Sequence, residues 1–66
     1  MNVRVNGTDR DVKAGTTVRA LVEEMGMGAQ AVAAEVNKQL VPRRKQEATV
    51  LKEGDVVELV SLVGGG

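Results

Sequence analysis

The residues best suited to chemistry stand at the carboxyl-terminal end of the sequence, in Val63-Gly64-Gly65-Gly66. Three consecutive glycines have no side chains to pack and keep the largest backbone freedom, so we do not expect them to fold onto a core. Fully extended, they reach on the order of 10 Å past the last strand residue, at roughly 3.3–3.6 Å per residue. A narrow slot in another protein can admit such an extended glycine segment together with the unobstructed carboxylate of Gly66. The alternative interpretation is a frayed chain end without function.

The composition argues against most other chemistry. Among 66 residues there is no cysteine and no histidine, so thiol chemistry is absent and the commonest general base and metal ligand are missing. There are no aromatic residues, which disfavours stacking on single-stranded nucleic acid. Nine basic and nine acidic residues cancel, so no net charge attracts nucleic acid or an anionic membrane. We therefore expect a protein that is not an enzyme, binds no cofactor or metal, and has neither nucleic acid nor membrane as a partner.

The sequence also predicts one small cytoplasmic domain. Met1-Asn2-Val3-Arg4-Val5 alternates in polarity and lacks the apolar core of a signal peptide. No apolar run approaches the length that spans a membrane. We expect a single domain over residues 1–63, followed by a flexible glycine tail over residues 64–66.

The amino-terminal segment predicts a hairpin. Val3 and Val5 alternate with polar residues, which is typical of a half-buried strand. Asn6-Gly7 follows, and this pair favours a type I′ turn because both central residues of that turn need positive φ. The returning strand, residues 8–12, is rich in charge, which indicates an edge position.

The next segment predicts a helix of two to three turns. Thr16 or Thr17 can cap its first turn through the side-chain hydroxyl. Gly26 stands where a left-handed residue ends a helix, and Met27 can make the accompanying hydrophobic contact. The helix is too short to persist alone, so it must pack on a sheet. Its apolar stripe consists of Val18, Leu21, Val22 and Met25.

Residues 31–36 combine helix-favouring alanines with strand-favouring valines, so propensity alone leaves this segment open. Asn37-Lys38 resembles a tight turn into residues 39–41, which favours a strand pair, although lysine dislikes positive φ. Pro42 cannot donate to a strand ladder and ends the short strand. Arg43-Arg44-Lys45 is a basic cluster, either a solvated loop or a partner contact. We expect Ala48, Val50 and Leu51 to lie beneath a loop and Glu53-Gly54-Asp55 to form a turn.

The run from Val56 to Val63 is the longest and most apolar, which predicts a central strand parallel to the first. Val57, Leu59 and Ser61 share one face, and Glu58 shares the other with Val56, Val60 and Leu62. One face must meet the helix. If the Glu58 face is the outer one, Val60 and Leu62 form an exposed apolar patch of the kind that marks binding surfaces. The alternative is that loops cover this face.

The order of elements, ββ-α-β-(β)-β, predicts an α+β fold with one main helix packed on one face of a mixed sheet of four to five strands. This layout, ending in Gly-Gly, resembles the β-grasp or ubiquitin-like superfamily, and within it the ThiS family of sulfur carriers in thiamin biosynthesis. The resemblance runs through the whole chain. Besides the first strand, it rests on Ala14-Gly15-Thr16-Thr17-Val18, on Asn37 before Gln39-Leu40-Val41-Pro42-Arg43, on Glu53-Gly54-Asp55 and on Gly65-Gly66.

The resemblance implies a mechanism and a set of partners. An adenylating enzyme of the ThiF or MoeB type uses ATP to activate the carboxylate of Gly66, and sulfur from a persulfide donor replaces AMP to leave a thiocarboxylate. Thiazole synthase then takes the sulfur. In this scheme Gly64 and Gly65 give access to the slot, Val60 and Leu62 dock, and Arg43 and Arg44 are polar contacts at the rim. Asn37, Pro42, Gly54 and Asp55 serve turns.

Three alternatives stay open on the sequence. The chain can be a sulfur carrier for another product, such as molybdopterin, thiolated tRNA or cysteine. It can be a ubiquitin-like modifier that joins Gly66 to lysines, because the same activated acyl group serves both reactions. It can also be a plain interaction module with incidental glycines.

Overall fold

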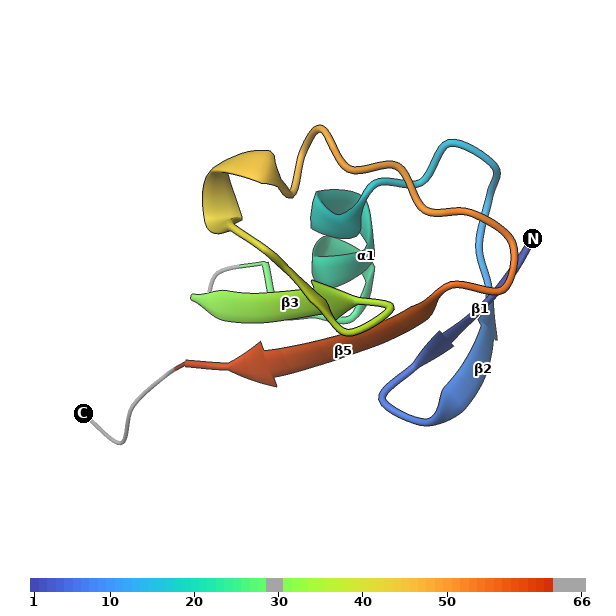
Figure 1. Ribbon diagram of the computed structural model, residues 1–66, viewed down its shortest axis with the longest axis horizontal. Coiled ribbons are helices and arrows are strands. Elements are labelled where there is room, and N and C mark those ends of the chain that lie inside the picture. Colours follow the sequence, from blue (N-terminus) through green and yellow to red (C-terminus); the bar gives the residue numbers. More distant parts are fainter. Residues whose placement is uncertain (29–30, 63–66) are drawn as a thin grey trace.

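The protein is described by a computed structural model over residues 1–28 and 31–62. One helix covers one face of a five-stranded mixed sheet (Figure 1), so the predicted α+β class and the fifth strand are confirmed. Among the described residues, no helix is long and apolar enough to cross a membrane. The elements in chain order are β1 (Asn2–Val5), β2 (Thr8–Asp11), α1 (Val18–Glu24), β3 (Val32–Val36), β4 (Gln39–Val41), the 3₁₀ turn η1 (Arg43–Lys45) and β5 (Val56–Ser61).

The strand β5 lies at the centre of the sheet, whose order is β2-β1-β5-β3-β4. It runs parallel to β1 and antiparallel to β3, as the sequence predicts for its central position. The charged strand β2 lies at one edge, also as predicted. Charged side chains at an edge discourage pairing with other chains.

Two tight turns with positive φ at both central residues set the register of the two hairpins. Asn6 and Gly7 have φ values of 51° and 84°, and Asn37 and Lys38 have φ values of 53° and 69°. The first turn confirms the Asn-Gly signal. The second turn follows residues 31–36, whose conformation the sequence left open. These residues contain the strand β3, which pairs with β4 on one side and β5 on the other. Pairing on both sides outweighs the helix propensity of its alanines.

The helix α1 has the ends that its sequence predicts. Thr17 is the N-cap, and its Oγ1 accepts a hydrogen bond from the Ala20 amide at 3.1 Å. Gly26 has a φ of 77°. Its amide donates to the Glu23 carbonyl while the Met27 amide donates to the Val22 carbonyl, which is a Schellman motif. Thr16 plays another part, because its hydroxyl donates to the Lys13 carbonyl at 2.7 Å.

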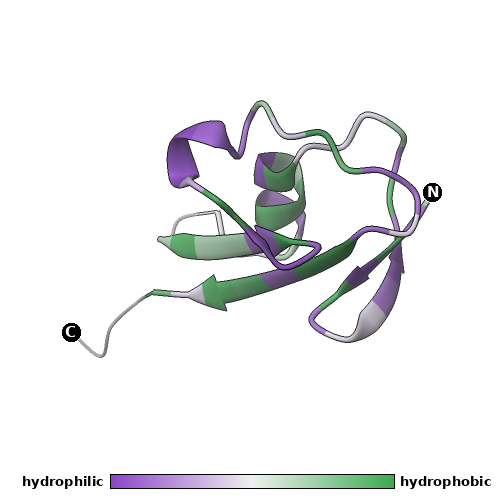
Figure 2. Cartoon of the chain, in the orientation of Figure 1, coloured by the Kyte–Doolittle hydropathy of each residue, from purple (hydrophilic) through white to green (hydrophobic). Residues whose placement is uncertain are grey.

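The core lies between α1 and the sheet. Figure 2 shows apolar residues along β3 and β5 and a hydrophilic η1. The more deeply buried of the two buried polar side chains in the described residues is Gln46, which is 2% exposed and donates through its Nε2 to the Val32 carbonyl at 3.1 Å. This bond satisfies the amide nitrogen and ties the segment after η1 to β3. The buried apolar residues are Val3, Val5, Val12, Val18, Leu21, Val22, Val32, Ala34, Val41, Leu51, Val57 and Leu59.

Two expectations about the connection before β5 are wrong. Ala48 is exposed and Val50 is 50% exposed, whereas Leu51 is buried as predicted. Val50 forms an isolated antiparallel bridge with Thr17, so the segment is extended there and neighbouring side chains point to opposite sides. The basic cluster Arg43–Lys45 is exposed and forms a 3₁₀ turn. The solvated-loop alternative is therefore correct about exposure but not about conformation, and the partner contact stays a prediction.

Candidate functional site

The site predicted from the sequence begins with Gly64, Gly65 and Gly66, which lie outside the described residues. The structure describes the element that leads to them. β5 ends at Ser61, and the Leu62 amide donates to the Ala31 carbonyl at 2.7 Å. The backbone is therefore held against the start of β3 as far as Leu62.

The outer face of the sheet, opposite α1, carries an exposed apolar patch. Along β5 the side chains alternate, so Val57 and Leu59 are buried at 0% and 4% exposure. Val60 and Leu62 are 57% and 58% exposed. The predicted exposed patch is therefore present, and the alternative that loops cover this face is wrong. We call the four exposed residues of this face the open-face patch: Leu40, Val56, Val60 and Leu62.

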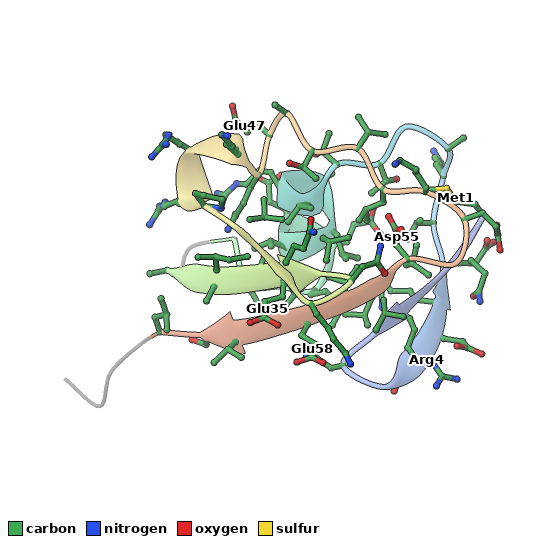
Figure 3. The ribbon with its side chains drawn as sticks, in the orientation of Figure 1. Met1, Arg4, Glu35, Glu47, Asp55 and Glu58 are labelled. Carbon is green, nitrogen blue, oxygen red and sulfur yellow. The ribbon has the colours of Figure 1, made fainter. Side chains whose placement is uncertain are left out.

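The strand register places two acids inside the open-face patch. Glu35 of β3 lies directly opposite Glu58 of β5 and, on its other side, opposite Leu40 of β4. Figure 3 shows both carboxylates on the side of the sheet away from α1. Glu35 was not predicted as a site residue, because its neighbours on the sheet come from pairings distant in sequence.

Arg43 and Arg44 lie in the helix layer, apart from the open-face patch. η1 sits above the sheet beside α1 (Figure 1), and the Arg19 amide of the helix donates to the Gln46 carbonyl that follows η1. Arg43 and Arg44 line a groove together with Arg19, Gln46 and Glu47. The structure therefore does not bring these arginines onto one surface with Val60 and Leu62.

Two of the residues assigned to turns, Asn37 and Asp55, brace the start of β5. The Asn37 Nδ2 donates to Asp55 Oδ1, and the Val56 amide donates to Asn37 Oδ1, both at 3.0 Å. Asp55 Oδ2 accepts from the Lys52 amide at 2.8 Å. Gly54 has a φ of 83°, and Pro42 directly follows β4. These contacts confirm the turn roles.

A second brace was missed in the sequence. The Asn6 Nδ2 donates to the Leu59 carbonyl at 3.2 Å, and the Leu59 amide donates to Asn6 Oδ1 at 2.8 Å. The side chain of Asn6 thus replaces a backbone partner and extends the β1–β5 pairing beyond Val57. The Asn-Gly signal predicted the turn but contained nothing about this second role.

Metal-ligating side chains are not clustered in the part of the chain that the structure describes. Residues 1–28 and 31–62 contain no group of three or more acidic side chains placed to hold a metal ion. Four ion pairs are present in that part of the chain, all with at least one exposed partner. The arrangement can present a docking surface and the strand end beside it.

Comparison with known proteins gives a consistent picture. A family model described as the ThiS family matches residues 3–66. A solved structure titled thiamine biosynthesis protein (ThiS) from Geobacter metallireducens is similar with a TM-score of 0.81 at 36% identity, and the match covers 100% of both chains. A sulfur carrier protein ThiS from Thermus thermophilus is 36% identical over 64 residues, which is 97% of this chain and 98% of the relative.

A further relative is much longer than this chain. A thiazole synthase from Paramagnetospirillum magneticum is 36% identical over 66 residues, which is 100% of this chain but 20% of that protein. The chain therefore spans about a fifth of the length of the first curated relatives that it matches.

Proposed function

The chain belongs to the ThiS family, and from that premise we propose that it is a sulfur carrier of thiamin biosynthesis whose reactive group is the carboxylate of Gly66. It acts as a co-substrate of larger enzymes and is not itself a catalyst. The observation that carries the proposal is the match to the family over residues 3–66, which includes the three glycines.

The proposed reaction begins with activation of Gly66. A carboxylate is a poor electrophile until one of its oxygens becomes part of a good leaving group. The Gly66 carboxylate attacks the α-phosphorus of ATP on an adenylating enzyme of the ThiF or MoeB type, and pyrophosphate leaves. Positioning and stabilisation of developing charge come from that enzyme, so the carrier needs no histidine or cysteine of its own.

Sulfur transfer follows on the acyl-adenylate. The terminal sulfur of a persulfide donor attacks the acyl carbon, and AMP leaves. A thiol then cleaves the sulfur–sulfur bond, which leaves a thiocarboxylate on Gly66 and a disulfide on the donor side. Thiazole synthase is the proposed sulfur acceptor. The thiazole synthase from Paramagnetospirillum magneticum with a segment similar to this chain supports that choice over other sulfur-accepting pathways.

Within this proposal the glycines and the apolar residues of β5 and its end keep the roles expected from the sequence. Gly64 and Gly65 give access to the catalytic slot, and Val60 and Leu62 contact the partner. The exposure of the open-face patch supports the docking role. Arg43 and Arg44 lie in the helix layer, so they can contact only a partner that also reaches around that side.

The proposal is tested by intact-mass measurement after incubation with an adenylating enzyme, ATP, a persulfide donor and a thiol. We expect a gain equal to exchanging one oxygen for sulfur, located on the fragment that contains Gly66. Reactions without ATP, and a variant with one alanine appended after Gly66, are the controls and should show no gain. A mass that stays constant with several competent adenylating enzymes contradicts the proposal. Higher-mass conjugates in cell extract would instead indicate a protein modifier.

A further inference from the structure

The open-face patch has two like charges at its centre. Glu35 and Glu58 are direct partners in the antiparallel β3–β5 pairing (Figure 3), and like charges directly opposite each other destabilise a sheet. Within residues 1–28 and 31–62, neither carboxylate takes part in an ion pair or a side-chain hydrogen bond. The free protein therefore places two like charges opposite each other within the open-face patch.

The neighbours of this acid pair are apolar. Leu40, opposite Glu35, is 66% exposed, and Val56 and Val60 precede and follow Glu58 on the same face of β5 at 42% and 57% exposure. The nearest cation in the register, Arg4, lies opposite Val56 and is engaged with Asp9 through an Nε–Oδ1 distance of 3.2 Å. The acid pair is thus surrounded by surface that a partner can dehydrate, and no cation of the described part bonds to it.

The open-face patch is poorly suited to binding a second copy of this chain. In a two-fold symmetric contact the same patch meets itself, so Glu35 and Glu58 would face the same two acids. A cationic side chain from a different partner would instead be attracted to both carboxylates. The guanidinium of arginine carries several donors in a planar fork and can bond to two carboxylates at once. Apolar contacts around such a pair exclude water and strengthen it.

We propose that the enzyme that activates Gly66 docks on the open-face patch and inserts a cationic side chain, an arginine by preference, between Glu35 and Glu58. This inference rests on the proposed function, since it takes the activating enzyme as the protein that binds the open-face patch. β5 connects the two sites directly, because it carries Glu58 and leads through Leu62 to residues 63–66.

The first measurement uses the free protein. Glu58→Gln removes the repulsion with Glu35 while keeping the shape of the side chain. We expect Tm to rise by about 2–4 °C, since relief of a like-charge cross-strand pair is a fraction of the stability of so small a domain. An unchanged or lower Tm means that the pair is not repulsive in solution and contradicts the premise.

The second measurement uses a ThiF-type adenylating enzyme with ATP, following pyrophosphate exchange. Relative to the unmodified chain, we expect the double variant Glu35→Gln with Glu58→Gln to raise KM about tenfold or more, with a weaker salt dependence and an unchanged kcat. The matched control is Glu24→Gln with Glu53→Gln, which removes two acids elsewhere and should stay within about twofold. The Glu53→Gln change keeps a side-chain oxygen that can still accept the hydrogen bond from the Asn2 amide.

The outcomes separate this inference from the proposed function. If the Glu35/Glu58 double variant gains sulfur with the KM of the unmodified chain, the acid pair is not recognised and the inference is wrong, while the proposed function stands. If the double variant keeps its KM but self-associates in sedimentation velocity, the acids serve to prevent self-association and the inference is again wrong. If the unmodified chain is never activated, the proposed function fails and the inference fails with it.

Discussion

At the scale of single residues, polar side chains form hydrogen bonds with backbone N–H and C=O groups that have no backbone partner. Thr17 accepts from the first turn of α1, and Asn6 bonds both polar backbone groups of Leu59. The role of Thr17 is local, since donor and acceptor are three residues apart, and it was predictable from helix-capping chemistry. The role of Asn6 joins positions 53 residues apart in sequence. No local pattern contains that information.

Replacing Asn6 tests this second role. Asn6→Gly removes both side-chain bonds to Leu59 but tolerates the φ of 51°, so we expect the free energy of unfolding to fall by about 1–2 kcal/mol. Asn6→Ala loses the same bonds and adds the steric cost of positive φ, on the order of a further 1 kcal/mol. Urea denaturation of both variants measures the loss of the two hydrogen bonds and, by difference, the added steric cost of alanine at positive φ. If Asn6→Gly is as stable as the unmodified chain, the bonds to Leu59 contribute nothing.

At the scale of elements, turn chemistry accounts for most of what the sequence could predict. Asn-Gly, the threonine cap and the glycine after α1 act within a few residues, so their structures follow from their types. The pairing of β3 with β5 does not, because it depends on the whole sheet. Glu35 was therefore missed, although the alternation along β5 placed Glu58 on one face with Val60 and Leu62. Val50 was wrongly assigned to the interior, because its exposure depends on the bridge to Thr17.

The β3–β4 turn has a less favourable residue at positive φ than the β1–β2 turn. Lys38 has a φ of 69°, a conformation that costs a side chain of this kind roughly 1–2 kcal/mol. Lys38→Gly should relieve that cost, partly offset by the backbone entropy of glycine, for a net gain of about 0.5 kcal/mol and a Tm about 2–4 °C higher. Thermal unfolding checks this, with Lys38→Ala as the control that removes the charge but keeps the strain. Equal gains in both variants would assign the effect to charge and contradict the strain argument.

At the scale of the whole molecule, the two faces of the sheet differ in burial. The helix covers one face of the sheet (Figure 1) and buries the core there, whereas the apolar side chains of the open-face patch on the other face are exposed. A small domain that leaves such side chains exposed gains no stability from them. The fold class and the central place of β5 were predicted, and the exposed patch was one of two alternatives that the sequence left open. The separation of Arg43 and Arg44 from that patch was not predicted, because it depends on how η1 packs beside α1.

The open-face patch can therefore be altered without loss of fold. For Val60→Thr with Leu62→Thr, we expect a change in unfolding free energy within about 0.5 kcal/mol, since both side chains are more than half exposed. KM for a ThiF-type adenylating enzyme should rise about tenfold through lost apolar contact. Val50→Thr, at 50% exposure in the helix layer, is the matched control and should leave KM unchanged. A double variant that unfolds, or one with the KM of the control, contradicts this assignment.

The central position of β5 has a consequence for synthesis. A ribosome delivers Val56–Ser61 only after β1, β2, α1, β3 and β4 have emerged, and β1 and β3 each need β5 as a neighbour. A chain interrupted earlier leaves both of those strands with an unpaired edge, which cellular proteases and chaperones recognise as unfinished. Completion of the sheet and synthesis of the strand that precedes the glycines are thus one event.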